Sequence, residues 1–289
     1  MLKCGTISIV GRPNTGKSSL MNYLLGEKVA IVSNKPQTTR ERILGVLTDE
    51  THQFVFVDTP GLHKPMNKLS ETMVKTVYEN AADVDISVLV VEAKPNVGKP
   101  EKILLDRLKE ANVKTILAIN KIDSIPINTV LPVIDAYSQI FEFEAIIPIS
   151  ARTGEGCDEL LNIIRSNLPE NEFIFPADTL TDQTERKLTA EFVREKLLKY
   201  LEKEVPHGIT TEIERFHERD DGIIDVDICI ICEKQNHKGI VIGKGGEMLK
   251  KIGEEARSDI ERMLNTKVFM TLYVKVSEDW RNKSVDFTY

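Results

Sequence analysis

The first part of the chain alternates continuous apolar runs with segments of helical period. Five runs, GTISIV, FVFVD, DISVLVVE, VKTILAIN and AIIPIS, lack the polar alternation of a half-exposed strand. Such runs are typical of strands that are covered on both faces, as in parallel sheets flanked by helices. Helix-period segments such as KSSLMNYLLG and KILLDRLKEA lie between them. This alternation predicts an α/β domain with a mostly parallel sheet.

A sixth strand is predicted by the segment ILGVLTDETHQFVFVD, in which two apolar stretches flank a short polar turn. A tight turn joins antiparallel neighbours, so one antiparallel strand is expected at the edge of a six-stranded sheet. The last helix of this domain, GCDELLNIIRSNL, is ended by Pro169. We therefore predict a first domain over residues 1–168 and a linker over 169–183, which contains two prolines, Pro169 and Pro176, and no helical period.

From Thr184 onward the order of elements changes. The pattern predicts a helix (RKLTAEFVREKLLKYLEKE), two strands (GITTEIERFHE and IIDVDICIICEK), a glycine loop, a helix (EMLKKIGEEARSDIERML) and a strand (TKVFMTLYVKV). This order indicates a small α+β domain over residues 184–289 rather than a repeat of the first domain.

Composition limits the classes of partner. The chain has 289 residues, 41% of them hydrophobic and 29% charged, with a net charge of −7, which is typical of a globular protein without a global basic field. Any site for a polyanion must therefore be a local patch. Cys229 and Cys232 form a CxxC within a predicted strand, where residues three apart point to opposite faces, so core thiols are expected. No apolar run approaches about 18 residues, and no secretory leader is visible.

The segment GRPNTGKS, residues 11–18, matches the pattern of a phosphate-binding loop, G-x-x-x-x-G-K-[ST]. It follows an apolar strand and begins a helix, which is the context that the mechanism requires. Glycines let the backbone curl around a phosphate, and the helix N-terminus adds positive potential. Lys17 is expected to contact the β- and γ-phosphates, and the Ser18 hydroxyl to bind Mg²⁺.

The segment NKID, residues 120–123, favours guanine over adenine. It follows an apolar strand, where ligands bind in open α/β sheets. The Asp123 carboxylate can accept hydrogen bonds from guanine N1–H and its 2-amino group, and adenine offers neither donor there. Asn120 would join this loop to the phosphate loop. In the segment SAR, after the next apolar run, the N–H of Ala151 could bind guanine O6.

The segment DTPG, residues 58–61, ends another predicted strand. Asp58 could hold Mg²⁺ through water, and the Gly61 N–H could contact the γ-phosphate. A threonine is also needed to close over Mg²⁺. Thr38 and Thr39 are both candidates, and the register favours Thr39.

The ordered set GRPNTGKS, TTR, DTPG, NKID and SAR resembles the translation-factor class of small GTPases over roughly residues 3–168. The resemblance implies a P-loop GTPase domain that uses GTP, GDP and Mg²⁺. It implies nucleotide contacts from Gly11, Arg12, Pro13, Asn14, Thr15, Gly16, Lys17, Ser18, Asp58, Thr59, Pro60, Gly61, Leu62, Asn120, Lys121, Ile122, Asp123, Ser150 and Ala151, with Ser18, Thr39 and Asp58 at the metal.

One part of the catalytic machinery is missing from the pattern. Leu62 follows DTPG, where Ras-like enzymes have the glutamine that orients the attacking water. A leucine side chain has no donor or acceptor, so slow intrinsic hydrolysis is expected. Asn14 resembles the asparagine of GTPases that use K⁺ beside the phosphates, which makes it a candidate K⁺ ligand. The groups expected to act in hydrolysis are thus Lys17, Thr39, Gly61 and Asn14, with switch segments near 29–42 and 62–70.

The second glycine loop, Gly243-Lys244-Gly245-Gly246, lacks the Lys-Ser end of a phosphate loop. It lies between helical segments within a helix–strand–strand–loop–helix–strand order. This order resembles a prokaryotic-type KH domain, whose G-x-x-G loop clamps the backbone of about four nucleotides. Lysines cluster around the loop at positions 234, 238, 244, 250 and 251. We expect Ile242, Gly243, Lys244, Gly245, Gly246 and Lys250 to contact single-stranded RNA.

A GTPase domain followed by a KH domain resembles the Era family of bacterial ribosome-assembly GTPases, also in the segments FPAD, VPHGITTEIERF and LYVKVSEDW. The resemblance implies binding to the 3′ end of 16S rRNA, assistance to 30S subunit assembly, a cytoplasmic location and peripheral association with the inner face of the cell membrane. A monomer without a DNA partner is expected. Leu62 keeps a second hypothesis open, an RNA-binding module whose nucleotide is mainly structural.

Overall fold

The computed structural model describes residues 1–35, 37–62 and 83–280. The described residues form two compact units: residues 1–32, 39–62 and 83–182 make up the first, and residues 33–35, 37–38 and 183–280 make up the second. Two parts of the expectations from sequence lie outside the described residues: most of the second switch segment, 63–70, and the tail that follows Trp280.

A six-stranded sheet forms the centre of the first unit. Its strands are β1 (Lys3–Val10), β2 (Ile43–Thr48), β3 (His52–Asp58), β4 (Ile86–Glu92), β5 (Lys114–Asn120) and β6 (Ala145–Pro148), in the order β2-β3-β1-β4-β5-β6. All neighbours are parallel except β2 and β3, and β2 lies at the edge. The prediction of a mostly parallel sheet with one antiparallel edge strand is confirmed.

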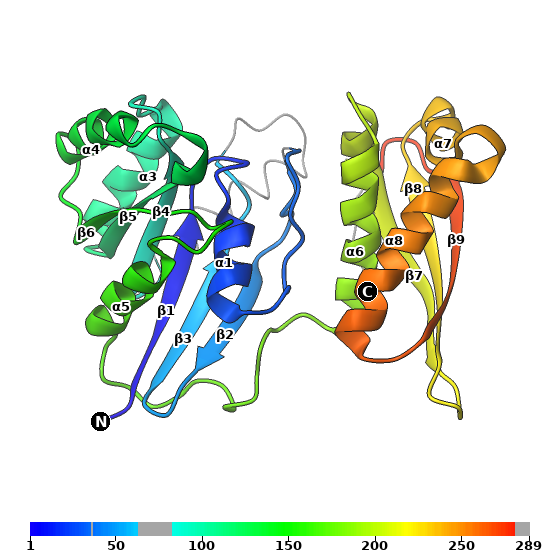
Figure 1. Ribbon diagram of the computed structural model, residues 1–289, viewed down its shortest axis with the longest axis horizontal. Helices are drawn as coiled ribbons and strands as arrows, with labels where there is room; N and C mark the ends of the chain where they lie inside the picture. Colours follow the sequence, from blue (N-terminus) through cyan, green and yellow to red (C-terminus); the bar gives the residue numbers. More distant parts are fainter. Residues whose placement is uncertain (36, 63–82, 281–289) are drawn as a thin grey trace. The chain divides into compact units, whose positions relative to one another are not determined.

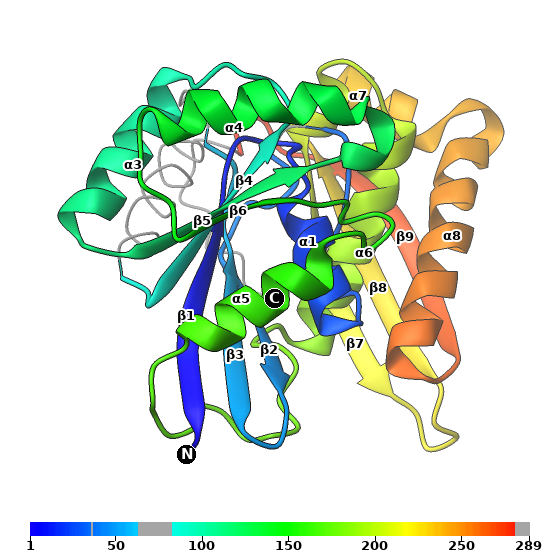
Figure 2. The same ribbon diagram turned by 60° about the vertical axis from the view of Figure 1, so that its left-hand side comes forward.

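Helices cover both faces of this sheet, which explains why its strands are apolar on both sides. α1 (Lys17–Leu25) and α5 (Cys157–Asn167) pack on one face. α3 (Lys99–Glu110) and α4 (Val130–Ser138) pack on the other, as Figures 1 and 2 show. Short 3₁₀ turns at Ile122–Ser124 and Ile127–Thr129 follow β5.

Helix α4 is not predicted by the sequence pattern. Its segment VLPVIDAYS is short and contains Pro132, which usually interrupts a helix. In the structure this proline is the third residue of α4, within the first turn, where a backbone N–H has no partner inside the helix. The burial of Val133 and Tyr137 against the sheet then holds the helix in place.

The predicted linker does not leave the first unit at once. Residues near Glu170 and Thr181 form isolated bridges with β1 and β2. Between these bridges, the fully buried amide of Gln53 accepts hydrogen bonds from the N–H groups of Ile174 and Phe175 at 2.8 and 2.9 Å. The same amide donates to the Phe175 carbonyl at 2.8 Å. One side chain of β3 therefore fixes the middle of the linker.

The second unit has a three-stranded sheet with helices on one face. Its elements are α6 (Glu185–Tyr200), a 3₁₀ turn (Val205–Gly208), β7 (Ile209–Glu218), β8 (Ile224–Cys232), α7 (Gln235–Ile242), a 3₁₀ turn (Lys244–Gly246), α8 (Glu247–Leu264) and β9 (Val268–Val276). The strand order is β7-β8-β9, antiparallel then parallel. α6 and α8 lie side by side on the same face (Figure 1).

One detail of this unit differs from the expected pattern, and one agrees with it. The helix expected to continue to Glu204 ends at Tyr200, because Leu201 is extended and buried and Lys203 adopts a left-handed conformation. Cys229 and Cys232 are buried free thiols, as expected of core residues. Burial raises the pKa of both thiols to about 11, so they stay protonated at neutral pH.

Among the described residues, no helix combines the length and apolar character that crossing a bilayer requires.

We predict that Gln53→Ala destabilises the first unit by about 2–3 kcal/mol and frees the linker, because the substitution leaves buried backbone groups without partners. Limited proteolysis should then cut faster between residues 170 and 178. Gln139→Ala, at an exposed position, is the matched control. Equal cleavage rates in the two variants would show that Gln53 does not hold the linker.

Candidate functional site

The predicted nucleotide loops follow β1, β3, β5 and β6, and all four strands end at the same edge of the parallel sheet. Ligands of open α/β sheets bind at this edge. The phosphate loop lies between β1 and α1, and residues 58–61 follow β3 (Figure 1). Residues 120–123 follow β5, and residues 150–151 follow β6. The topology thus brings together loops that are far apart in the sequence.

The phosphate loop needs glycine at two positions. A Cβ on Gly11, whose φ is +149°, would lie 2.2 Å from the carbonyl oxygen of Val90. A Cβ on Gly16, whose φ is +96°, would lie 2.2 Å from the amide nitrogen of Asn120. α1 begins at the next residue, Lys17, and no side chain caps its first turn. Its first N–H groups are therefore suited to an anion.

Two buried charged groups face each other beside this loop. The Lys17 ammonium donates to the Arg12 carbonyl at 2.9 Å and is only 6% exposed. Burial lowers the pKa of Lys17 to about 8, and the nearby Asp58 carboxylate opposes part of this shift. Burial likewise raises the pKa of Asp58, against the opposing effect of Lys17 and its hydrogen bonds. A phosphate near Lys17 and a metal ion near Asp58 would each favour the charged form of the group.

The three expected metal ligands converge. The Ser18 hydroxyl donates to Asp58 at 2.6 Å and lies 3.0 Å from the Thr39 hydroxyl, which lies 3.4 Å from the same carboxylate. The other oxygen of Asp58 is buried without a hydrogen-bond partner among the described residues. Hydroxyl and carboxylate oxygens suit Mg²⁺, so this group of residues fits the ion. Thr38 instead bonds its own turn through the Lys35 carbonyl, so the geometry favours Thr39.

The Asn120 side chain joins three loops. Its amide nitrogen donates to the Thr15 carbonyl at 2.7 Å. Its oxygen accepts from the N–H groups of Lys121 at 2.7 Å and Ala151 at 2.9 Å. Asn120 is 2% exposed, so these bonds are shielded from water. The amide therefore sets the spacing between the phosphate loop and the loops expected to hold the base.

Asp123 and Lys121 belong to the same loop as Asn120. The Ser150 hydroxyl donates to Asp123 at 2.7 Å, and Arg152 forms an ion pair with the same carboxylate. The Ser150 hydrogen bond, followed by Arg152, lowers the pKa of Asp123, which stays an ionised acceptor at neutral pH. Lys121 donates to the Asn14 carbonyl at 2.6 Å and pairs with Glu92 at the end of β4. The sequence pattern did not indicate Glu92.

Other predicted residues act through backbone or packing. The Arg12 side chain pairs with the buried Glu101 in the first turn of α3. Within the phosphate loop, Arg12 contributes its backbone carbonyl, which accepts from Lys17. Gly61 packs so closely on Pro13 that a Cβ would lie 2.5 Å from its nitrogen. The N–H of Leu62 donates to the Gly11 carbonyl, and its side chain is buried in the apolar cluster on the α3 side of the sheet.

The remaining predicted residues also lie at this edge of the sheet. The Thr59 hydroxyl donates to the Ile9 carbonyl at 3.1 Å, and Pro60 is buried beside it. Asn14 adopts a left-handed conformation with φ of +65°, which asparagine tolerates better than most residues. Ile122 begins the 3₁₀ turn after β5.

The second glycine loop is at the surface. Lys244 and Gly245 are exposed, and Ile242, Gly243 and Gly246 are half-buried. Gly243, Gly245 and Gly246 have φ values of +72°, +60° and +83°, which favour glycine. A Cβ on Gly243 would also lie 2.7 Å from that of Met248. No side chain caps α8, so the first turn of this helix, like that of α1, is suited to an anion.

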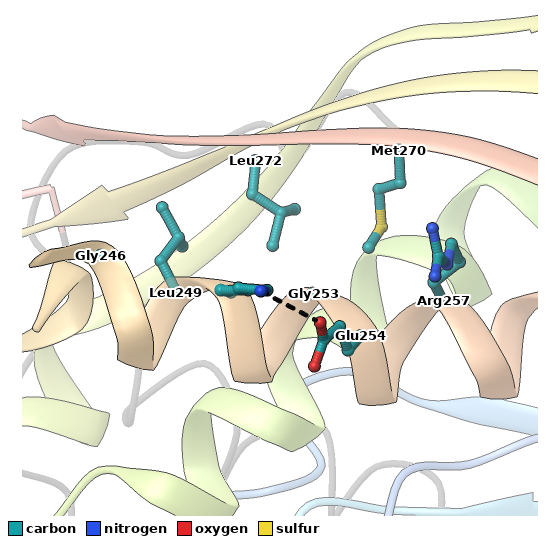
Figure 3. Close-up of a pocket in the computed structure, with 8 residues that line it drawn as sticks. Gly246, Leu249, Gly253, Glu254, Arg257, Met270 and Leu272 are labelled. Carbon is teal, nitrogen blue, oxygen red and sulfur yellow. Dashed lines mark ion pairs between the residues drawn. The ribbon is translucent and has the colours of Figure 1, made fainter.

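A groove of about 360 Å³ runs from this loop between α8 and β9, and we call it the α8–β9 groove. Figure 3 shows Leu272 and Met270 pointing from the strand toward the helix. The lining residues are Gly246, Leu249, Lys250, Gly253, Glu254, Arg257, Met270 and Leu272. Of these lining residues, the sequence analysis named only Gly246 and Lys250 as expected RNA contacts. The helix residues recur every three or four positions, a signal of one helix face that could have indicated them.

Two family models match successive parts of this chain. Residues 6–121 match the family model of the 50S ribosome-binding GTPase, and residues 204–281 match that of the KH domain. GTPase Era of Ruminiclostridium cellulolyticum is 48% identical over 280 residues, which are 97% of this chain and 94% of that protein. GTPase Era of Alkaliphilus metalliredigens is 48% identical over 283 residues, which are 98% of this chain and 96% of that protein.

Two solved structures are also similar over nearly the whole chain. A crystal structure of Era with MgGDPNP and nucleotides 1506–1542 of 16S ribosomal RNA matches with a TM-score of 0.93 at 39% identity, covering 98% of this chain and 97% of that one. A crystal structure of an Aquifex aeolicus Era variant bound to GDP·AlF₄⁻ matches with a TM-score of 0.93 at 40% identity and the same coverage.

We predict that guanine nucleotide affinity falls by up to about tenfold per pH unit above pH 8. Phosphate oxygens stabilise the protonated Lys17, so binding takes up one proton when pH exceeds the pKa of about 8. Titration calorimetry with GDP and Mg²⁺ between pH 7 and 9 measures both affinity and proton uptake. Lys17→Arg, whose side chain stays charged, should bind more weakly but with a flat profile. A wild-type profile as flat as that of Lys17→Arg contradicts this assignment.

Proposed function

Because the chain belongs to the Era family of GTPases, we propose that it is a GTP-driven switch that binds the single-stranded 3′ end of 16S rRNA and assists assembly of the small ribosomal subunit. It is a GTPase, with GTP, GDP and Mg²⁺ as its ligands. The observation that carries the proposal is the hydrogen bonding of Asn120. Its side chain connects the phosphate loop to the loops that we propose bind guanine.

The residues of the site have separable roles in hydrolysis. In this proposal the backbone of the phosphate loop and Lys17 bind and orient the phosphates, and the Gly61 N–H donates to the γ-phosphate. When bound at Ser18, Thr39 and Asp58, Mg²⁺ neutralises charge on the phosphate oxygens. Leu62 offers nothing to a water molecule, because its side chain is apolar and buried. Hydrolysis is therefore slow, and K⁺ near Asn14 is part of the proposal.

RNA binding is supported by the second unit. The Gly243–Gly246 loop can approach a phosphate closely, and Lys244 and Lys250 are exposed beside it. The α8–β9 groove offers Leu249, Met270 and Leu272 to base faces. Among the described strands, β9 lies at the edge of its sheet, so its backbone is placed for base edges. A relative in the same family was crystallised with a 16S rRNA fragment.

The cellular setting is also part of this proposal and rests on family membership. We place the protein in the cytoplasm, associated with the 30S subunit and peripherally with the inner face of the membrane. We expect a monomer that binds no DNA. The competing hypothesis is a nucleotide that only stabilises the fold, and the apolar, buried Leu62 is the observation that keeps it open. Multiple-turnover phosphate release separates the two, because a structural nucleotide does not turn over.

We predict that GTP turnover is at least about tenfold faster in KCl than in NaCl at equal ionic strength, because a monovalent cation can stabilise charge between the phosphates. Asn14→Gly should remove this difference. Glycine accepts the left-handed conformation at this position, so GDP affinity should change little. Phosphate release measures the rates. Equal rates for the wild type in the two salts would remove K⁺ from the mechanism.

We predict that Lys244→Glu and Lys250→Glu each weaken binding of a 16S rRNA 3′-end oligonucleotide by about tenfold and reduce its salt dependence, because each loses a phosphate contact. GTP affinity should be unchanged. Lys109→Glu is the control, because it makes the same change of charge at an exposed position of α3 in the first unit. If the control lowers RNA affinity as much as the two loop variants do, net charge rather than a local site governs binding.

A further inference from the structure

Gly253 lies in the interior of α8, where glycine is a poor choice. Glycine destabilises a helix relative to alanine, because it loses more backbone freedom on folding. Its φ is not among the positive values of the chain, so no left-handed conformation requires it. Beyond its own stretch of helix, a Cβ there would meet only Leu272 Cδ1 at 3.3 Å and Met270 Cε at 3.9 Å, and no backbone atom of another element within 4 Å. The fold of the unit could therefore accept alanine.

The missing side chain instead affects the α8–β9 groove. Gly253 lines this groove directly opposite the ends of Leu272 and Met270 (Figure 3). Any side chain at this position would project into the space between helix and strand. The glycine thus exposes bare helix backbone along the groove.

We propose that Gly253 sets the depth of the α8–β9 groove and admits one unpaired RNA base, which lies flat against α8 between Leu249 and the two side chains of β9. This inference rests on the proposed RNA-binding function and names a residue that selects the ligand. A base suits the space because its faces are apolar and flat, while its edge is polar.

The charges of the groove agree with a nucleotide occupant. Lys250 and Arg257 can meet the phosphates on either side of the base. Glu254 is the one carboxylate of the lining, and it lies 3.9 Å from the Lys250 ammonium, as the dashed line in Figure 3 shows. A carboxylate repels phosphate but accepts hydrogen bonds from the amino group of a base. Apolar walls with such a rim are typical of a site that holds a base and leaves its phosphates in solvent.

The first test uses Gly253→Ala and Gly253→Leu in the full chain, with the 16S rRNA 3′-end oligonucleotide as probe. We expect affinity to fall about fivefold for alanine and about thirtyfold or more for leucine, since stacking of one base contributes a factor of about 5 to 150. Both residues favour helix, so the unfolding temperature should stay equal or rise by about 2 °C. Ser258→Ala, exposed on α8 outside the groove, should change RNA affinity less than about twofold.

The second test replaces one nucleotide of the probe at a time with an abasic ribonucleotide. With the wild type, one position should lose about fivefold or more in affinity. With Gly253→Leu, the same replacement should cost nothing further, because the base is already excluded. Identical penalties in the two proteins, or unchanged affinity of Gly253→Leu for the intact probe, overturn the inference about Gly253 alone. A wild type that fails to bind the intact probe overturns the proposed RNA-binding function.

Discussion

The arrangement of the loops in the nucleotide site depends on the buried side-chain amide of Asn120. It satisfies one carbonyl of the phosphate loop and N–H groups of the two loops expected to hold the base. Buried polar groups are costly without partners, so these three loops keep a single arrangement. Gly16 packs against the same amide, because a Cβ at this position would lie 2.2 Å from the amide nitrogen of Asn120. The spacing between phosphate and base is therefore set by the fold, which lowers the ordering cost of binding.

The buried charges of Lys17 and Asp58, beside the Asn120 amide, lower the stability of the fold. Burial shifts the pKa values of both Lys17 and Asp58 toward their neutral forms. The attraction between the two charges offsets only part of the loss of hydration. A triphosphate would supply anions near Lys17, and a metal ion would supply positive charge near Asp58. The site therefore lowers the stability of the protein without ligand, and ligand binding raises that stability.

The second unit meets a polyanion by different means. Its glycine loop and the basic side chains near it, Lys244 and Lys250, lie in solvent, where phosphate contacts form without burial of charge. Selection among ligands falls to the α8–β9 groove, whose walls are largely apolar. A surface lysine attracts any nucleic acid, whereas a groove of fixed depth accepts only a strand with unpaired bases. The two units therefore divide recognition between buried charge for one nucleotide and an exposed loop with an apolar groove for an RNA strand.

The sequence by itself determined the residues whose chemistry is local. The phosphate loop, the NKID loop and the Gly243–Gly246 loop follow from residue type and spacing, because glycine conformation and helix N-termini act within a few residues. The apolar runs also determined the parallel sheet and its antiparallel edge strand. Only the tertiary structure decided which side chains meet across long separations. It paired Arg12 with Glu101, joined Gln53 to the linker and placed Leu272 opposite Gly253. Such pairs depend on how strands and helices pack, and no local pattern encodes that packing.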